Sequence, residues 1–242
     1  MRETWEESFQ EQIALGAYNT APVEALVRSV SYYLRDRYPD GDYSGLHFAE
    51  MGCGAGPNLL WLAQKGTRVS GVDIAPTALD LAKGLLEHNG YGDRVGSLVE
   101  ASVSDVPIED ESFDGILESC VYQHLAKEDR LAAFAEVDRL TKPGGVFVGH
   151  MLEQQHTVFE KHAGEQLPDD PGTLQLEEGG SKIHLTNIGL SHFFSADEMP
   201  GLFPGWSVVD PCLAQYEIPQ TEAAKRGYER YLQSMLIVYA IK

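Results

Sequence analysis

The stretch LHFAEMGCGAGPNLLWLAQKG, residues 46–66, passes from an apolar run through three glycines into apolar residues at helical spacing. The third glycine of the turn, Gly56, follows two residues after Gly54 and four after Gly52, whereas a dinucleotide-binding fingerprint places it three after the second. Pro57 suits the first turn of a helix, whose free N–H groups can bind a phosphate, a carboxylate or a nucleoside. The stretch therefore predicts either a ligand site at a strand-to-helix turn or a simple tight connection.

Strand-and-helix units continue beyond this turn as far as about residue 151. Apolar runs that end in turn residues alternate with segments of helical spacing, which is typical of βα units around a parallel sheet. Ligands of such sheets gather at the carboxyl ends of the strands. Strands are expected at residues 46–51, 68–73, 96–101, 113–119 and 144–151, and helices at residues 58–66, 75–90 and 127–145.

The segments after residue 151 follow a different pattern. Residues 156–191 are rich in Gly, Pro and acid, which indicates a long connection over the strand ends. Ser195 and Glu198 have the spacing of a capping box at the start of a short helix, and residues 206–218 and 235–242 are expected to form an antiparallel pair. We predict an α/β fold with a Rossmann-like, doubly wound, mostly parallel seven-stranded sheet, an antiparallel last strand and an amino-terminal helical cap.

The composition limits the class of ligand. The chain has 242 residues, 43% of them hydrophobic, and a formal net charge of −19. Because no basic run offsets this charge, nucleic acid is disfavoured as a partner and a small molecule or a cation is favoured. The acidic start, the lack of an apolar run of membrane length and the three scattered cysteines suit a cytoplasmic protein, and the oligomeric state stays open.

Three acidic residues stand at the ends of predicted strands. Asp73 lies 19 residues after Gly54, which is the spacing of an acid that binds ribose hydroxyls, although an N-cap role for the next helix suits it as well. Glu50 and Glu118 end two other strands, where two carboxylates would repel a pyrophosphate and attract a sulfonium or an ammonium. Together these residues favour a cationic cofactor without phosphate.

Four motifs, EMGCGAGPN, GVDIAPTALDLAK, VPIEDESFDGILESCVYQHL and RLTKPGGVF, occur in that order across residues 48–147. In order and spacing they resemble the motifs of class I S-adenosylmethionine-dependent methyltransferases. The resemblance implies S-adenosylmethionine as the cofactor. It also implies that Asp73 holds the ribose, that Glu118 lies near the sulfonium and amino group, and that the methionine end is approached by Glu50, Gly52, Gly54 and Gly56.

The adenine end departs from the family in one residue. The resemblance implies that Ile74 packs on the adenine and that Ser102 and Val103 line its edge. The family often has an Asp where this chain has Ser102, so the usual carboxylate for the adenine amino group is missing. Ser102 itself, the nearby Asp105 or a backbone carbonyl can accept that hydrogen bond instead.

The first 20 residues are loosely similar to the amino-terminal cap of methyltransferases of the thiopurine, thiol and tellurite-resistance type. The similarity implies that Tyr18 and Thr20 reach the cofactor carboxylate and that Trp5 forms a wall of the substrate pocket. Phe9 and Tyr32 are more simply interpreted as aromatic residues that pack a helix on the sheet.

Methyl transfer from a sulfonium is an in-line displacement, for which a general base is optional. His124 and His150, after the fourth and fifth predicted strands, are the candidate bases, although a helix-start histidine bonded to backbone is an equal interpretation of His124. Tyr122 and Glu153 are candidate substrate contacts. Glu153 and His156 are three residues apart, but this spacing occurs once, and no convincing set of metal ligands is present.

We expect one domain, residues 1–242, with a cap (1–45), a cofactor-binding core (46–151), a lid (152–194) and a terminal helix with strands (195–242). The predicted function is transfer of a methyl group to an N, O or S nucleophile of a small molecule. One alternative is a methyltransferase for protein or peptide side chains, which the acidic surface would recruit. The other is a noncatalytic module that binds the cofactor as a sensor or scaffold.

Overall fold

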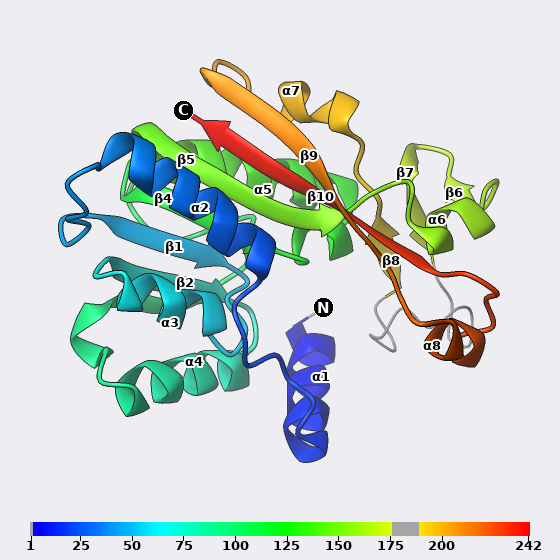
Figure 1. Ribbon diagram of the computed structural model, residues 1–242, viewed down its shortest axis with the longest axis horizontal. Coiled ribbons are helices and arrows are strands. Elements are labelled where there is room, and N and C mark those ends of the chain that lie inside the picture. The colour runs from blue at the N-terminus through cyan, green and yellow to red at the C-terminus, as the bar shows by residue number, and fades with distance from the viewer. Residues whose placement is uncertain (1, 176–188) are drawn as a thin grey trace.

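A computed structural model describes residues 2–175 and 189–242, and its centre is a seven-stranded sheet (Figure 1). The strand order is β3-β2-β1-β4-β5-β10-β9. Strands β1 to β5 are mutually parallel, and β10 pairs antiparallel with both β5 and β9. The predicted Rossmann-like sheet is thereby confirmed. Its strands are β1 (His47–Met51), β2 (Arg68–Asp73), β3 (Val95–Glu100), β4 (Phe113–Ser119), β5 (Thr141–Leu152), β9 (Val208–Glu217) and β10 (Leu232–Ile241).

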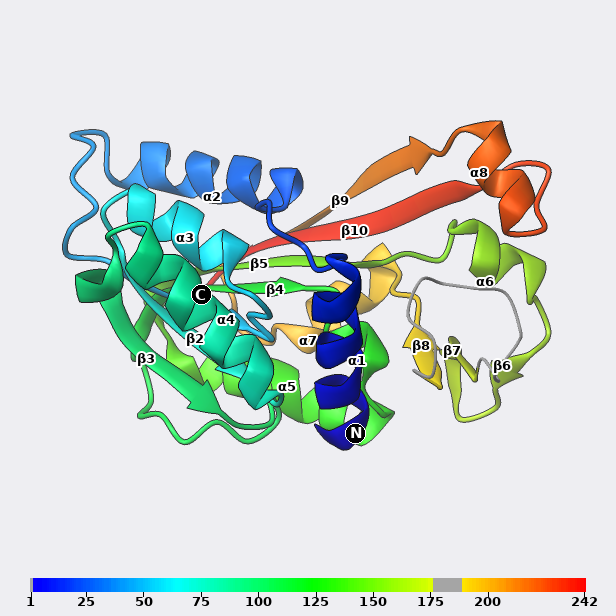
Figure 2. The ribbon, with the colours of Figure 1, turned by 90° about the horizontal axis from the view of Figure 1, so that it is seen from below.

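Helices cover both faces of the sheet (Figures 1 and 2). On one face α2 (Glu24–Arg37), α3 (Pro57–Gln64) and α4 (Pro76–His88) bury residues such as Leu26, Leu62 and Leu86 in one apolar cluster. On the other face α5 (Lys127–Leu140) and α7 (Met199–Leu202) bury Phe134 and Met199 in a second cluster. Short 3₁₀ turns are η1 (Gly92–Arg94), η2 (Tyr122–His124) and η3 (Ala196–Glu198).

The amino-terminal helix α1 (Arg2–Leu15) stands apart from these layers, near the carboxyl ends of β1 and β2 (Figures 1 and 2). It contains no buried residue. Polar contacts join it to the core: the Glu6 carboxylate accepts hydrogen bonds from the backbone and hydroxyl of Thr77, and Arg2 pairs with Glu100. Because these contacts are solvent-exposed or half-buried, they hold α1 weakly.

The predicted long connection after β5 contains regular structure. It forms α6 (Thr157–Lys161) and a second sheet of β6 (Gln166–Leu167), β7 (Asp170–Gln175) and β8 (Leu190–His192). A buried ion pair explains part of this order, because Arg130 of α5 donates to both carboxylate oxygens of Asp170 at 2.8 and 2.9 Å. The part of the predicted lid at residues 176–188 lies outside the described residues.

The carboxyl-terminal segment follows the prediction. The capping box of Ser195 and Glu198 is formed at η3. Strands β9 and β10 pair along their full length, and α8 (Gln220–Lys225) lies in the connection between them. The ends of β9 and β10 extend beyond the core strands, on the same side as α6 and β6–β8 (Figure 1). The ends of β9 and β10, together with α6 and β6–β8, therefore lie beside the carboxyl ends of β4 and β5 (Figure 1).

Candidate active site

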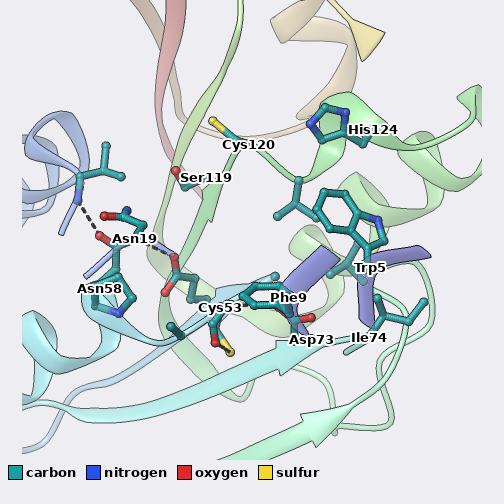
Figure 3. A pocket seen from close by; sticks show the side chains of 18 of the residues that line it. Trp5, Phe9, Asn19, Cys53, Asn58, Asp73, Ile74, Ser119, Cys120 and His124 are labelled. Carbon is teal, nitrogen blue, oxygen red and sulfur yellow. Dashed lines mark hydrogen bonds between the residues drawn. The ribbon is translucent and has the colours of Figure 1, made fainter. Parts of the chain in front are cut away.

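A cavity of about 240 Å³ lies at the carboxyl ends of the parallel strands (Figure 3). Of the residues that the sequence singled out, the following line it: Trp5, Glu50, Gly52, Gly54, Asp73, Ile74, Ser102, Val103 and His124. Other lining residues had no signal of their own in the sequence, among them Asn19, Asn58, Ser119, Cys120 and Leu125. Phe9, which was interpreted as packing a helix on the sheet, also lines the cavity. The cavity lining does not include Tyr18, Thr20, Gly56, Glu118, Tyr122, His150 or Glu153.

The three glycines of the turn have different structural roles. All three have positive φ, and the backbone N–H of Gly54 donates to Asp73 at 2.9 Å, so this part of the turn faces the cavity. A Cβ at Gly56 would lie 2.9 Å from the Cβ of Ala82 in α4. Gly56 therefore permits close packing of α3 against α4 and does not line the cavity, contrary to the contact that the resemblance implied.

Asp73 binds the glycine turn and the backbone just before α4, but the N-cap residue of that helix is Ala75, so the predicted N-cap role is wrong. Oδ1 of Asp73 accepts from the backbone N–H of Ala75 at 3.0 Å at the start of α4, and its Oδ2 accepts from Gly54. The side chain lines the cavity, and burial raises its pKa despite these hydrogen bonds. A carboxylate offers about four lone-pair sites, so Asp73 can hold the turn and still accept from two hydroxyl groups.

Two buried carboxyl groups lack part of their hydrogen bonding. Glu50 Oε1 accepts from Asn58 at 2.6 Å, and Glu118 Oε1 accepts from the backbone of Val121 at 2.6 Å. Oε2 of each group is buried, and no atom of residues 2–175 or 189–242 bonds to it. Burial raises the pKa of Glu50 to about 8, with smaller contributions from Asp73 and Glu118, and the pKa of Glu118 to about 7.

The unpaired Oε2 atoms of Glu50 and Glu118 indicate whether S-adenosylmethionine, the cofactor that the resemblance implies, fits this site. An unpaired buried carboxyl group is costly, and a cation beside it restores the missing interaction. Glu50 lines the cavity directly, whereas Glu118 lies behind Val121 and outside the lining. A nucleoside on Asp73 with a cationic group near Glu50 suits these residues, and a pyrophosphate does not.

Helix α1 contributes Trp5, Phe9 and Gln12 to the cavity lining, and the first two are drawn in Figure 3. The ring of Phe9 reaches within 3.4 Å of where a Cβ on Gly54 would lie, next to Cys53 and Asp73, and Trp5 contacts the ring of His124 at 5.7 Å between centroids. Asn19, rather than the predicted Tyr18 or Thr20, reaches the cavity from the segment after α1.

The two predicted catalytic histidines differ in their hydrogen bonding. His124 lines the cavity, but its Nδ1 lies 3.1 Å from the carbonyl oxygen of Leu190 and its Nε2 lies 3.2 Å from Nε2 of Gln123. Gln123 is fixed, because its Oε1 accepts from the backbone of Leu152 at 2.8 Å. Nδ1 of His124 therefore carries the proton and Nε2 accepts from Gln123, so no ring nitrogen is left to act as a base.

Burial lowers the pKa of His124 and that of His150 to about 4, so both rings are neutral at pH 7. His150 is outside the cavity lining, but its Nδ1 lies 3.4 Å from Oγ of Ser119 and 3.6 Å from Sγ of Cys120, two residues that do line it.

The two predicted substrate contacts lie away from the cavity. Tyr122 is fully buried between Phe134 and Phe147 in the core on the α5 side. Glu153 is buried and accepts hydrogen bonds from Ser234 at 2.5 Å and from the backbone of Gln155 at 2.9 Å. Both residues were predicted from their position after a strand, and that position does not show that their side chains point into the protein core.

The predicted acceptors for the adenine amino group, Ser102 and Asp105, differ in their position relative to the cavity. Ser102 lines the cavity with its Oγ 2.7 Å from Oγ of Ser104, whereas Asp105 is not in the lining.

Among the described residues no group of three His, Cys, Asp or Glu side chains is placed to hold a metal ion. Likewise, none of the helices described is long and apolar enough to cross a membrane.

The glycine turn and Asp73 lie at the carboxyl ends of parallel strands in a Rossmann-like sheet, where ligands of such folds bind. The family model described as "Methyltransferase domain" matches residues 49–149. The methyltransferase GfsG of Streptomyces halstedii is 33% identical over 198 residues, which cover 75% of this chain and 68% of that protein. The chain belongs to the class I S-adenosylmethionine-dependent methyltransferases, and S-adenosylmethionine is its cofactor.

Other comparisons agree with this assignment. Malonyl-[acyl-carrier protein] O-methyltransferase of Serratia marcescens is 31% identical and covers 64% of this chain and 60% of its own length. The 1,6-didemethyltoxoflavin-N1-methyltransferase of Burkholderia thailandensis shares the fold, with a TM-score of 0.60 and 18% identity over 100% of this chain and 86% of that one. The matches to two further relatives cover 42% and 44% of this chain and only 40% and 31% of the lengths of those relatives. The resemblance of the cap to the thiopurine and tellurite-resistance type stays a prediction.

Proposed function

We propose that this protein transfers a methyl group from S-adenosylmethionine to an N, O or S nucleophile of a small molecule. The observation that carries the proposal is the small cavity that α1 encloses, with the unpaired Oε2 of Glu50 in its wall. A side chain of a folded protein would need an open groove there, and Trp5 and Phe9 occupy that opening (Figure 3). Relatives named for small-molecule substrates, such as a 2-heptyl-1-hydroxyquinolin-4(1H)-one methyltransferase, support the same substrate class.

The chain's own residues then act mainly by positioning. The bound cofactor supplies an electrophilic methyl group. Asp73 would accept hydrogen bonds from the ribose hydroxyls, and Glu50 would face the cationic methionine end of the cofactor. Closure of α1 would exclude water, and alignment of the nucleophile with the methyl group would account for most of the rate. The three cysteines are free, which supports the reducing cytoplasm as the location.

Two rival functions have their own signatures. An enzyme for protein side chains would methylate basic peptides better than free small molecules, because the net charge of −19 attracts them. A noncatalytic sensor would bind the cofactor without turning over any acceptor.

The test begins with calorimetry of S-adenosylhomocysteine, the demethylated product. The protein is then incubated with S-adenosylmethionine and a panel: 2-heptyl-1-hydroxyquinolin-4(1H)-one, a phenol, a thiol, a primary amine and a set of basic peptides. Mass spectrometry of the products identifies the methylated class. Turnover of a small molecule supports the proposal, and product binding with methylation of peptides alone, or of nothing in the panel, contradicts it.

A further inference from the structure

A second cavity, of about 440 Å³, lies between the start of α2 and the sheet. Its helix side is formed by Val23, Ala25 and Arg28, and its sheet side by His150, Ala214 and Met235. Strand register explains the second group, because Met235 of β10 pairs with Leu152 of β5 and with Ala214 of β9, on the face of the sheet that also carries His150. We call this cavity the acceptor groove.

The acceptor groove is separated from the cofactor cavity by a single layer of side chains. Val23 lines both cavities. His150 lines the groove, while its Nδ1 lies 3.4 Å from Oγ of Ser119 and 3.6 Å from Sγ of Cys120, which line the cofactor cavity. Val23 and the contacts of His150 with Ser119 and Cys120 thus connect the linings of the two cavities.

His150 has a free nitrogen where His124 has none. Both nitrogens of His124 are engaged, by Leu190 and by Gln123. Nδ1 of His150 faces Ser119 and Cys120, and within the described ranges no residue forms a hydrogen bond with its Nε2. The neutral ring of His150 can therefore accept a hydrogen bond from a molecule in the groove.

The charges and shape of the groove indicate which molecules fit it. Its charged residues, Glu24 and Arg28, are largely exposed and are paired with each other at 2.7 and 2.8 Å, so together they add no net charge to the groove. The rest of the lining consists of the small or apolar Val23, Ala25, Ala214 and Met235 and of three exposed residues with polar groups, Gln215, Tyr216 and Gln233. An uncharged molecule with a flat apolar body and one O–H or N–H group matches this lining.

We propose that the acceptor groove binds the methyl acceptor, an uncharged, flat, apolar molecule whose O–H or N–H group donates to Nε2 of His150. The inference rests on the proposed methyltransferase function. As the acceptor's oxygen or nitrogen bonds to the methyl carbon, the carbon–sulfur bond breaks and its electron pair stays on sulfur. The acceptor's proton passes to Nε2 of His150 and then to water, which restores the neutral ring. Ser119 and Cys120 form the partition and turn aside to admit the nucleophile.

The first experiment measures binding in protein saturated with S-adenosylhomocysteine. Histidines labelled with ¹⁵N are observed by NMR while 2-heptyl-1-hydroxyquinolin-4(1H)-one, the chosen probe, is added. The Nε2 signal of His150 should shift, and the variant Ala214→Trp, which fills the groove, should lower the affinity for the probe at least tenfold. The matched control is Leu213→Trp, because Leu213 is 47% exposed and points to the opposite face of the same strand.

The second experiment measures kcat/KM for whichever small acceptor in the panel is methylated. Ala214→Trp and His150→Phe should each lower it at least tenfold while the affinity for S-adenosylhomocysteine stays within twofold of the wild type, and Leu213→Trp should leave both unchanged.

Each outcome is decisive. A shift at His124 without one at His150, equal effects of the two Trp variants, or no response to the probe at either histidine overturns the groove assignment. Failure of the wild type to bind S-adenosylhomocysteine overturns the proposed function instead, and calorimetry detects that failure before any acceptor is added.

Discussion

Glu50 and Asn58 form a hydrogen bond of 2.6 Å inside the cofactor cavity, and the same Asn58 accepts from the backbone of Val23 at 2.8 Å. One amide thus joins the end of β1 to the start of α2, and it fixes Glu50 Oε1 while Oε2 stays unpaired. This relationship explains how a carboxyl group with a pKa of about 8 is held at the site. It also leads to the first two predictions.

Glu50→Gln should stabilise the ligand-free protein at alkaline pH. Because the folded state raises the pKa of Glu50 from 4.5 to about 8, the folded protein binds the extra proton, and stability is lost as pH rises between these values. The neutral Gln has no such loss. The variant's free energy of unfolding should match the wild type near pH 5 and exceed it by on the order of 2 kcal/mol at pH 8.5. Urea unfolding at both values measures this, with exposed Glu128→Gln as the control; a difference that does not depend on pH would contradict the shift.

Binding of S-adenosylhomocysteine should release protons. Its ammonium group favours the charged forms of Glu50 and Glu118, whose pKa values burial raises to about 8 and about 7. Affinity should therefore rise between pH 6 and pH 8, and Glu50→Gln should weaken binding and reduce the proton release. Calorimetry in two buffers of different ionisation enthalpy counts the protons. Uptake of protons, or none, would show that neither carboxyl group faces the cation.

Asp73→Ala should weaken binding of S-adenosylhomocysteine by about 1.5–3 kcal/mol, the loss of a charge-assisted hydrogen bond to ribose. The variant also removes the hydrogen bonds to Gly54 and Ala75, so it will lower stability as well. Asp73→Asn keeps one oxygen for the turn and serves as the comparison. Calorimetry and thermal unfolding separate the two effects, and unchanged affinity would leave Asp73 only as the support of the turn.

The glycines of the turn should divide into two roles. Gly54→Val should abolish cofactor binding, since its side chain would enter the cavity beside Phe9. Gly56→Ala should lower the stability, because its Cβ meets Ala82 at 2.9 Å, while the folded fraction still binds S-adenosylhomocysteine. Normal binding by Gly54→Val would place the cofactor elsewhere.

The sequence predicted the core of the fold well because the information there is local. Alternating apolar runs and Gly-ended helices between residues 46 and 151 specify βα units whatever the rest of the chain does. The small sheet of β6–β8 was not predicted, because its order depends on contacts such as that between Arg130 and Asp170, which are 40 residues apart. The same reason applies to His124, whose nitrogens are occupied by Gln123 and by Leu190, 66 residues away.

Helix α1 should behave as a lid over the cofactor. It buries no residue of its own and is held mainly by Glu6–Thr77 and Arg2–Glu100, so it should exchange amide hydrogens quickly without ligand and be protected when S-adenosylhomocysteine is bound. Closure over the cofactor cavity excludes water from the methyl group, so removal of residues 1–15 should lower turnover of the panel acceptor more than it lowers affinity for S-adenosylhomocysteine. Hydrogen exchange with and without ligand tests the first point, and steady-state kinetics with calorimetry test the second, with exposed Glu7→Gln as the control. Equal protection in both states, or full turnover by the truncated chain, would mean that α1 is not a lid and that the cavity works open.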